Sequence, residues 1–425
     1  MKILLIGSGG REHALAMKLK ASSRVAQILV APGNGGTETI AHNIPVSPND
    51  TRTLALAASR YGIDLTIVGP EGPLANGIVD EFENLGLPIF GPSKDAALLE
   101  SSKSFSRDIA LKYSIPSPEF KVFRSYVEGY EFLKNHEGPV VVKADGLAAG
   151  KGTFVCLDRE AAINALYDCM EDRIFGVAGS TVIIEEYIAG QEISVFGITD
   201  GEHISELATA CDYKRLLDGN RGLNTGGMGS YTPSDKWTEK LAEQVRSEIM
   251  EPVVKGMASQ DMPYKGVLYA GIMLTATGPK LLEFNCRFGD PETQVILPSM
   301  NSDIVEVMEA SIQGKIDKAS VDWGSDTTVG VVMASRGYPG DYRRGLEING
   351  LDTLDDDVIA FHSGTKRVKG NSSQILTDGG RVLTIVGSGP SIEAARDKVY
   401  NNVAKVEFQG SHFRKDIALI QKEEE

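Results

Sequence analysis

The sequence predicts a multidomain α/β protein, and three observations lead to this class. Residues 1 to about 102 alternate short apolar strands with segments of helical period, an order typical of a doubly wound parallel sheet. The rest of the chain mixes apolar strands, glycine-rich turns and helices, which favours further α+β domains. A length of 425 residues also suggests roughly three domains.

Composition argues against several classes of function. The 43 basic and 58 acidic residues give a net charge of -15, which disfavours a general nucleic-acid or anionic-membrane binder. No apolar run approaches the roughly 20 residues that cross a bilayer. The four cysteines form no Cys-x-x-Cys pair, so we expect reduced thiols in a cytoplasmic protein.

The first region places glycines at the carboxyl ends of its strands, where such sheets bind ligands. The stretch GSGGREHA is similar to a dinucleotide fingerprint, but Glu12 replaces the third glycine and no acidic residue ends the second strand. These departures disfavour NAD binding. A phosphate monoester at the helix N-terminus fits better, because Gly9 and Gly10 permit close approach and Arg11 adds positive charge. We expect His13 to pack within the helix instead of binding a ligand.

A second motif, VVVKADGLAAGKGTFVC, joins two apolar strands through a glycine loop. Lys143 lies on the first strand, and the loop holds Lys151 together with Gly146, Gly150 and Gly152. The spacing does not match a Walker A loop, because Gly152 follows the lysine where Ser or Thr should stand. A flap whose backbone N–H groups and lysines cover phosphates explains the pattern. A plain surface hairpin is the alternative.

The third motif, VIIEEYIAGQEIS, ends an apolar strand in Glu185 and Glu186 and places Glu192 on the next strand. Backbone groups at such a crossover can bind an adenine edge, and a carboxylate a few residues later can hold ribose hydroxyls. An ordinary acidic turn is the alternative.

A long loop is predicted within CDYKRLLDGNRGLNTGGMGSYTP. Asp212 and Lys214 precede this loop, and Asn224 and Gly226 lie in it. A loop of this length inside a compact domain is usually functional or disordered. Its glycines let a ligand approach the backbone, although a mobile surface loop remains the alternative.

The stretch KLLEFNCRFGDPETQ crowds charge onto an apolar strand. Strand alternation predicts two faces, with Leu281, Glu283, Asn285 and Arg287 on one and Leu282, Phe284, Cys286 and Phe288 on the other. The preceding strand should pair with it through a junction at Gly278 and Pro279. Carboxyl and amide oxygens two residues apart suit a hard cation such as Mg2+, and a nearby arginine suits a phosphate on the same metal. A solvated face with ion pairs is the alternative.

Taken in order, these segments resemble the ATP-grasp ligases and, within them, the glycinamide ribonucleotide synthetase family. The segments that carry the resemblance are GSGGREHA, PGNGG, VGPEGPL, VKADGLAAGKG, EEYIAGQEIS, DYKR, NTGGMGSYTP and RFGDPETQ. The resemblance implies a preATP-grasp domain over residues 1–102, an ATP-grasp domain over 103–325 with a lid at about 119–190, and a C-terminal domain over 326–425. It also implies ATP-dependent ligation of glycine to 5-phospho-D-ribosylamine through glycyl phosphate, in de novo purine biosynthesis.

The resemblance assigns roles residue by residue. Glu283 and Asn285 would hold Mg2+ or Mn2+. ATP would bind at Lys103, Lys143, Gly146, Gly150, Lys151, Gly152, Glu185, Glu186, Tyr187, Ile188 and Glu192. The other substrates would lie at Gly9, Gly10, Arg11, Glu71, Asp212, Asn224 and Gly226. Arg287, Asp290 and Lys214 would be catalytic.

Three rival interpretations remain open. Another purine-pathway ATP-grasp enzyme would use formate or bicarbonate. A nicotinamide oxidoreductase would need the acidic residue that the second strand lacks, and a non-catalytic nucleotide sensor would not need oxygens at metal spacing. The expected partners are small molecules, without nucleic acid or membrane, and the expected state is a monomer or a weak homo-oligomer.

Overall fold

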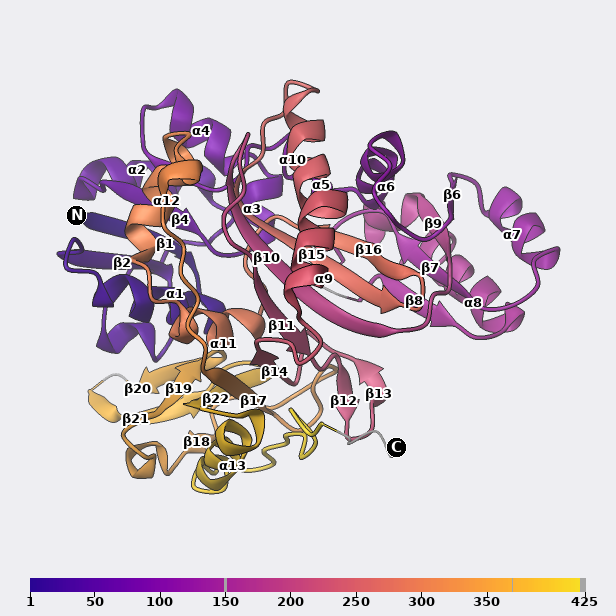
Figure 1. The fold of residues 1–425 in the computed structure, drawn as a ribbon. Coiled ribbons are helices and arrows are strands. Elements are labelled where there is room, and N and C mark those ends of the chain that lie inside the picture. Colours follow the sequence, from indigo (N-terminus) through magenta and orange to yellow (C-terminus); the bar gives the residue numbers. More distant parts are fainter. Residues whose placement is uncertain (149–150, 369, 421–425) are drawn as a thin grey trace.

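The N-terminal region folds around a five-stranded parallel sheet of order β3-β2-β1-β4-β5 (Figure 1). The computed structural model describes residues 1–148, 151–368 and 370–420. The strands are β1 (Lys2–Gly7), β2 (Gln27–Pro32), β3 (His42–Asn43), β4 (Leu65–Val68) and β5 (Ile89–Phe90). The helices are α1 (Gly10–Ala21), η1 (Thr37–Thr39), α2 (Thr51–Tyr61), α3 (Glu71–Ala75), α4 (Ile78–Asn84) and α5 (Leu98–Ser101).

Both faces of this sheet are buried, which confirms the doubly wound prediction. Leu4 and Ile6 of β1 pack into one core with helices α2 and α4, whereas Ile3 and Leu5 pack into a second core with α1. Strands that are apolar on both faces are typical of parallel sheets with helices on each side.

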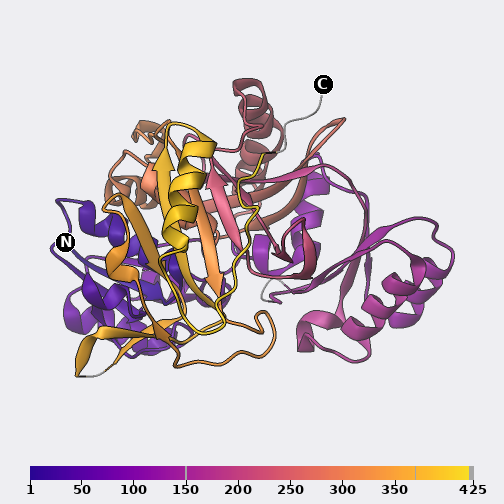
Figure 2. The same cartoon turned by 90° about the horizontal axis from the view of Figure 1, so that it is seen from below.

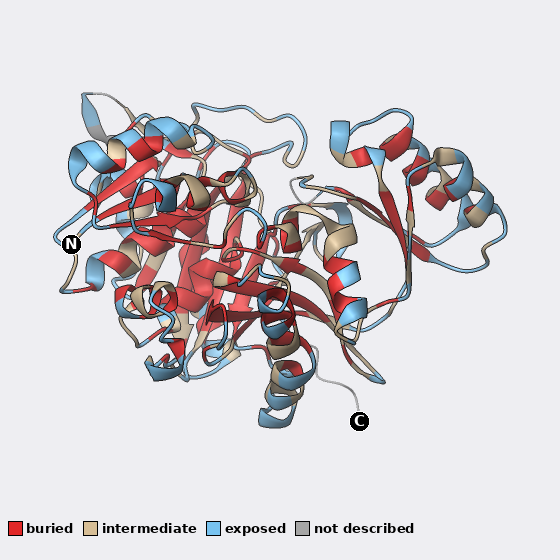
Figure 3. Cartoon of the chain, turned by 90° about the horizontal axis from the view of Figure 1, so that it is seen from above, coloured by how far each residue is buried: buried red, intermediate tan, exposed pale blue. Residues whose placement is uncertain are grey.

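The region from β6 to β9 forms a separate lobe at one side of the molecule (Figure 1). Its antiparallel sheet has the order β6-β9-β7-β8 and its own hydrophobic core, which Figure 3 shows as a separate band of buried strands. The strands are β6 (Phe120–Phe123), β7 (Val140–Ala144), β8 (Thr153–Cys156) and β9 (Val182–Glu186). The helices are α7 (Tyr126–Lys134), α8 (Arg159–Met170) and η2 (Gly176–Ser180), and α6 (Lys103–Lys112) precedes the lobe.

An eight-stranded sheet of order β16-β15-β10-β11-β14-β17-β22-β19 forms the centre of the molecule. Its strands are β10 (Gln191–Asp200), β11 (Ala208–Asp212), β14 (Gly229–Thr232), β15 (Lys265–Thr275), β16 (Gly278–Asn285), β17 (Thr327–Ala334), β19 (Val358–His362) and β22 (Arg381–Gly389). Because β14 pairs with β17, the sheet continues from the central into the C-terminal region.

The remaining elements surround this sheet, and Figure 2 shows α13 lying across the C-terminal strands. The helices are α9 (Glu239–Val245), η3 (Arg246–Met250), α10 (Glu251–Ala258), α11 (Glu292–Ser299), α12 (Ile304–Ile312), η4 (Ile316–Lys318), η5 (Leu351–Thr353) and α13 (Ile392–Val403). The short strands are β12 (Arg215–Leu217), β13 (Arg221–Asn224), β18 (Glu347–Ile348), β20 (Thr365–Val368) and β21 (Asn371–Thr377). No helix of the described residues is long and apolar enough to cross a membrane.

The alternation predicted for β16 is wrong before Glu283. The pairing with β15 shifts register between Leu281 and Glu283, so Leu282 is the extra residue of a β-bulge. As a result Leu281 is fully buried, on the same side as Phe284, and Leu282 is only half-buried. The junction was predicted at Gly278 and Pro279, but both residues already belong to β16, which begins at Gly278, so the turn from β15 lies just before them.

Two buried histidines join the N-terminal and C-terminal regions. The backbone N–H of His362 donates to Nδ1 of His13 at 2.9 Å, and the two rings lie 5.4 Å apart. Burial lowers the pKa of His13 to about 3, with a further contribution from His362, and burial lowers the pKa of His362 to about 4. Both rings are therefore neutral in the folded protein at neutral pH, and His13 packs within the structure as the sequence predicts.

We expect the free energy of unfolding to fall as the pH drops below about 6.5. The unfolded histidines take up protons there while the folded ones do not, so each contributes a slope of about 1.4 kcal/mol per pH unit. Urea unfolding between about pH 7.5 and 5 measures this slope as the difference between parent and variant, because burial raises the pKa of Asp212 and its protonation in the folded state acts in the opposite sense. His362→Gln should reduce the slope by the contribution of one histidine, about 1.4 kcal/mol per pH unit. Replacing the exposed His42 by Gln should leave the slope unchanged. Equal slopes in the two variants would contradict the interpretation.

Candidate functional site

Glu283 and Asn285 lie two residues apart on β16 and are both half-buried. Neither side chain makes a hydrogen bond or an ion pair within residues 1–148, 151–368 and 370–420. Burial raises the pKa of Glu283, but the positive charges of Lys214, Lys143 and Lys103 outweigh it and lower the pKa below its ordinary value. An ionised carboxylate and an amide oxygen without partners fit the oxygen ligands that Mg2+ or Mn2+ prefers.

A buried ionic network holds Lys143 next to β16. Its Nζ lies 2.7 Å from Oε2 of Glu185 and donates to the carbonyl oxygen of Leu282 at 3.1 Å. Arg107 of α6 binds both carboxylate oxygens of Glu185, at 2.6 and 2.9 Å. Arg107 also donates to the carbonyl oxygens of Leu281 and Leu282. The bulge in β16 thus presents two successive carbonyl groups to Arg107 of α6 and Lys143 of the lobe.

The pKa shifts of Glu185 and Lys143 are both downward, which favours the charged form of the carboxylate but not that of the lysine. Burial raises the pKa of Glu185, but Lys143 and Arg107 lower it to about 2. Burial lowers the pKa of Lys143, and Glu185 opposes this effect. Arg107 was missed in the sequence, although it lies four residues after Lys103 on one helix, a spacing that places both on the same face.

The glycine loop after β7 is held at its beginning. Nζ of Lys103 donates to the carbonyl oxygens of Ala144 and Gly146, each at 3.0 Å. Nζ of Lys151 lies 3.4 Å from the carbonyl oxygen of Pro339 in the C-terminal region. Gly150 lies outside the described residues. Thus Lys103 anchors the base of the loop, and Lys151 reaches the C-terminal region.

A second charged group lies beside Glu283. Lys214 forms an ion pair with Glu192. Glu192 and Glu283 both lie close to Gly271, because a Cβ added there would lie 3.4 Å from Cγ of Glu283 and 3.8 Å from Oε1 of Glu192. Burial lowers the pKa of Lys214, but the charge of Glu192 and its other anionic neighbours raise it well above its usual range. A charged lysine therefore pairs with Glu192 and acts electrostatically on Glu283.

Asp212 is a further acidic neighbour of Lys214. Its Oδ1 is buried and has no hydrogen-bond partner among the described residues. Burial, and then the negative charge of Glu292, raise the pKa of Asp212 well above its ordinary value. Glu292 itself accepts from Tyr269 at 3.0 Å and from Ser194 at 3.3 Å. The sequence did not single out Glu292.

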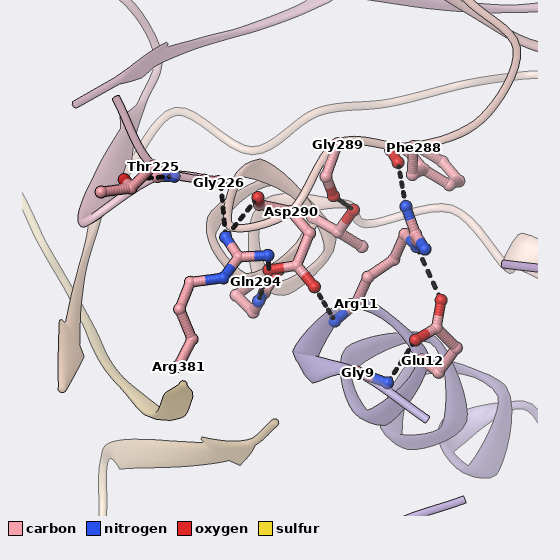
Figure 4. A network of polar contacts seen from close by, with 12 residues as sticks. Gly9, Arg11, Glu12, Thr225, Gly226, Phe288, Gly289, Asp290, Gln294 and Arg381 are labelled. Atoms are coloured by element: carbon pink, nitrogen blue, oxygen red, sulfur yellow. Dashed lines mark hydrogen bonds and ion pairs between the residues drawn. The ribbon is translucent and has the colours of Figure 1, made fainter. Parts of the chain in front are cut away.

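Asp290 connects three parts of the chain (Figure 4). Its Oδ2 accepts the backbone N–H of Arg11 at 3.2 Å, and its Oδ1 accepts from Gln294 at 2.9 Å. Nη2 of Arg381 lies 3.3 Å from Oδ1, and Nη1 of Arg381 donates to the carbonyl oxygens of Asp290 at 2.7 Å and of Gly226 at 2.5 Å. The carboxylate is thus surrounded by donors from the N-terminal, central and C-terminal regions. Arg381 was missed, because a lone arginine after two glycines gives no pattern.

The N-terminus of α1 is already occupied by carboxylates. The N–H of Gly9 donates to Oε2 of Glu12 at 2.5 Å, while that of Arg11 donates to Asp290. The Arg11 side chain is buried, pairs with Glu12 at 2.6 Å and donates to the carbonyl oxygen of Phe288 at 3.1 Å. A phosphate bound directly at Gly9 and Gly10 would have to displace these contacts.

A small cavity lies beside this helix, and both Arg11 and Arg287 line it. The rest of its lining includes Gly69 after β4 and Phe90 of β5, so it opens at the carboxyl ends of the parallel strands. Arg287 lies 3.1 Å from Glu71 and 2.9 Å from Glu100. Burial raises the pKa of Glu71, but Arg287 and Arg11 lower it to about 2. The other lining side chains are mostly apolar, and both guanidinium groups are already paired with carboxylates.

The structure therefore gathers most of the predicted residues into two groups of neighbouring side chains. One group surrounds Glu283 with three lysines, and the other surrounds Asp290 and the cavity. Across the described part of the chain, no polar side-chain contact links Tyr187, Ile188 or Asn224 to either group.

Comparisons with known protein families match three successive parts of the chain. The family models are those of phosphoribosylglycinamide synthetase: its N domain matches residues 1–100, its ATP-grasp (A) domain 101–293 and its C domain 328–420. A phosphoribosylamine–glycine ligase of Caldanaerobacter subterraneus subsp. tengcongensis is 47% identical over 418 residues, which cover 98% of this chain and 99% of the relative. One from Escherichia coli O157:H7 is 44% identical over 421 residues, which cover 98% of each.

Solved structures with the same architecture include members of this family and of others. The phosphoribosylamine–glycine ligase of Thermotoga maritima is 31% identical, with a TM-score of 0.85 over 98% of this chain and 100% of that one. The biotin carboxylase domain of a 2-oxoglutarate carboxylase from Hydrogenobacter thermophilus is 16% identical, with a TM-score of 0.74 over 97% of this chain and 91% of that one. At this low identity the second likeness shows the fold alone.

Proposed function

The chain belongs to the phosphoribosylglycinamide synthetase family, and we propose how its residues join glycine to 5-phospho-D-ribosylamine while ATP becomes ADP and phosphate. The reaction is an ATP-dependent ligation that forms a carbon–nitrogen bond, and it gives glycinamide ribonucleotide in purine biosynthesis. A carboxylate reacts poorly with an amine, because its oxygen is a poor leaving group. Phosphorylation of the glycine carboxylate removes this obstacle.

One observation carries the assignment of the reaction centre: the unpaired oxygens of Glu283 and Asn285 lie beside a group of lysines. Glu283 and Asn285 would hold Mg2+ or Mn2+, which supplies charge neutralisation between anionic reactants. Lys103 and Lys143 would contact the ATP phosphates, and Glu185 keeps Lys143 in place. Positioning and electrostatic stabilisation are the main contributions of a protein to phosphoryl transfer.

The reaction has two steps. A glycine carboxylate oxygen attacks the γ-phosphorus, and the bond to ADP breaks, giving glycyl phosphate. The amine nitrogen of phosphoribosylamine then attacks the carbonyl carbon, phosphate leaves and the nitrogen loses a proton. Because an acyl phosphate hydrolyses readily, we assign to the loop between β7 and β8 the role of excluding water.

We place the remaining groups by their surroundings. The adenine would lie along the segment from Glu185 to Ile188 in the lobe at about 119–190, with Glu192 near its ribose. The 5-phosphate of phosphoribosylamine would lie over Gly9, Gly10 and Arg11, with Glu71 nearby, and would displace the carboxylates that bind the N–H groups there. Asp212 and the loop at Gly226 would form the glycine side of the site.

The same proposal covers the setting of the enzyme. We propose domains over residues 1–102, 103–325 and 326–425, acting together in the cytoplasm as a monomer or a weak homo-oligomer. Small molecules are its proposed partners, and the net charge of -15 gives no general attraction for nucleic acids.

The experiment that tests the function measures ADP release with each substrate omitted in turn. We expect release to require ATP, glycine and phosphoribosylamine together. ADP release with formate or bicarbonate in place of glycine would support a rival ATP-grasp enzyme instead. ATP binding without turnover under all conditions would support a sensor.

A further inference from the structure

We propose that Tyr338 and Arg381 are positioning residues, which clamp the peptide groups of Gly226 and so shape the glycine side of the site from the C-terminal region. The inference rests on the proposed function for its kinetic consequence. Neither residue binds a reactant in the mechanism above, and the sequence singled out neither of them.

Both backbone groups of Gly226 are bound by C-terminal side chains. The N–H of Gly226 donates to the hydroxyl of Tyr338 at 2.9 Å, and its carbonyl oxygen accepts from Nη1 of Arg381 at 2.5 Å. A Cβ added at Gly226 would lie 3.1 Å from Cζ of Arg381, so a larger residue would press against the guanidinium group. The absence of a side chain is what allows the arginine to cover this peptide.

The clamp is connected to residues of the proposed reaction centre. Thr225, the neighbour of Gly226, donates its N–H and its hydroxyl to the carbonyl oxygen of Lys214 at 2.8 and 2.9 Å. Through these bonds the position of Gly226 is tied to the backbone of Lys214, whose ammonium group lies beside Glu192. A shift of the loop would therefore move Lys214.

Arg381 binds a second segment at the same time. Its contacts with the carbonyl oxygen of Asp290, at 2.7 Å, and with the Asp290 carboxylate, at 3.3 Å, join the loop to the turn before α11 (Figure 4). That carboxylate also accepts the N–H of Arg11 at the start of α1. One guanidinium group thus joins two adjacent segments, the loop at Gly226 and the turn at Asp290.

The two clamp residues are themselves packed together. A Cβ added at Gly380 would lie 2.4 Å from Cδ2 of Tyr338, so the tyrosine ring rests on the backbone that leads into Arg381. Pro339, the next residue after Tyr338, offers its carbonyl oxygen to Lys151 of the glycine loop. The segment that bears Tyr338 therefore contacts both loops that border the site.

The test compares Arg381→Gln and Tyr338→Phe with Arg60→Gln. Arg60 is the control, because it is exposed on α2 in the N-terminal region and no contact among the described residues joins it to the clamp. We expect Arg381→Gln to lower kcat by about 10- to 100-fold and to raise the KM for glycine, because small misplacements of this kind are costly. The KM for ATP should stay within about twofold, since the phosphate contacts are made by other elements. Tyr338→Phe should show the same pattern more weakly.

A second readout does not depend on activity. Hydrogen exchange of the Gly226 amide should be faster in Tyr338→Phe than in the parent protein, because its acceptor is lost. Unchanged exchange together with an unchanged KM for glycine would overturn the clamp, as would equal kinetics in Arg381→Gln and Arg60→Gln. If the parent protein forms no ADP with glycine, the proposed function fails. The hydrogen-exchange experiment still tests whether Tyr338 holds the Gly226 amide. If Arg381→Gln does not fold, the kinetics and the hydrogen exchange of Tyr338→Phe test the clamp.

Discussion

Replacing Glu283 by alanine should lower glycine-dependent ADP formation by about 100- to 1,000-fold, an effect of the size seen when one electrostatic contact in an active site is removed. Glu283 is the only carboxylate of the pair on β16, and its negative charge is maintained by the surrounding lysines. Without it, the cation that offsets repulsion between glycine and ATP would lose its charged ligand.

Steady-state ADP release measures this effect, with the metal concentration varied. Glu283→Gln keeps the shape of the side chain but removes the charge, so it should also be impaired and should need more Mg2+. Glu83→Gln, an exposed change on α4, is the control and should leave the rate unaltered. Near-normal turnover of Glu283→Ala at low Mg2+ would rule out the metal assignment.

Replacing Glu185 by alanine should reduce the free energy of unfolding by about 3–5 kcal/mol, the loss expected when one partner of a buried ionic group is removed. Arg107 and Lys143 would then lie in the interior without their common counter-charge. Lys143→Met should cost less, because Glu185 would keep its two bonds to Arg107.

Urea unfolding, followed by circular dichroism, distinguishes these variants. Glu186→Ala is the matched control on the same strand, since Glu186 is exposed, lies 3.7 Å from Lys280 and accepts the backbone N–H of Glu119 at a long 3.4 Å. Its effect should stay within about 0.5 kcal/mol. If Glu185→Ala and Glu186→Ala were equally stable, the buried network would contribute little to the folded state.

Much of the fold follows from local patterns. Apolar runs such as residues 2–7 predict buried parallel strands, and the structure confirms them, because burial on both faces requires side chains that are apolar throughout. The bulge at Leu282 could not be predicted in the same way. Strand alternation assumes one residue opposite one residue, and nothing in the local sequence marks the position at which the partner strand slips.

The candidate site was predictable where residues that act together lie close together in the chain. Glu283 and Asn285 are two residues apart on one strand, so their shared face follows from the pleat. Arg107 and Arg381 meet their partners only through the tertiary structure, at separations of 78 residues from Glu185 and 91 from Asp290. Such pairings need the arrangement of whole regions, which a local pattern does not contain.

The continuity of the eight-stranded sheet limits how this chain can be divided. A polypeptide cut after residue 325 would retain β14 but lose β17, its hydrogen-bonded neighbour. The exposed edge would offer a row of backbone donors and acceptors to another molecule, which is a common origin of aggregation. Truncated forms should therefore be designed around the β6–β9 lobe, because all four strands of its sheet lie between residues 120 and 186 and it has its own hydrophobic core.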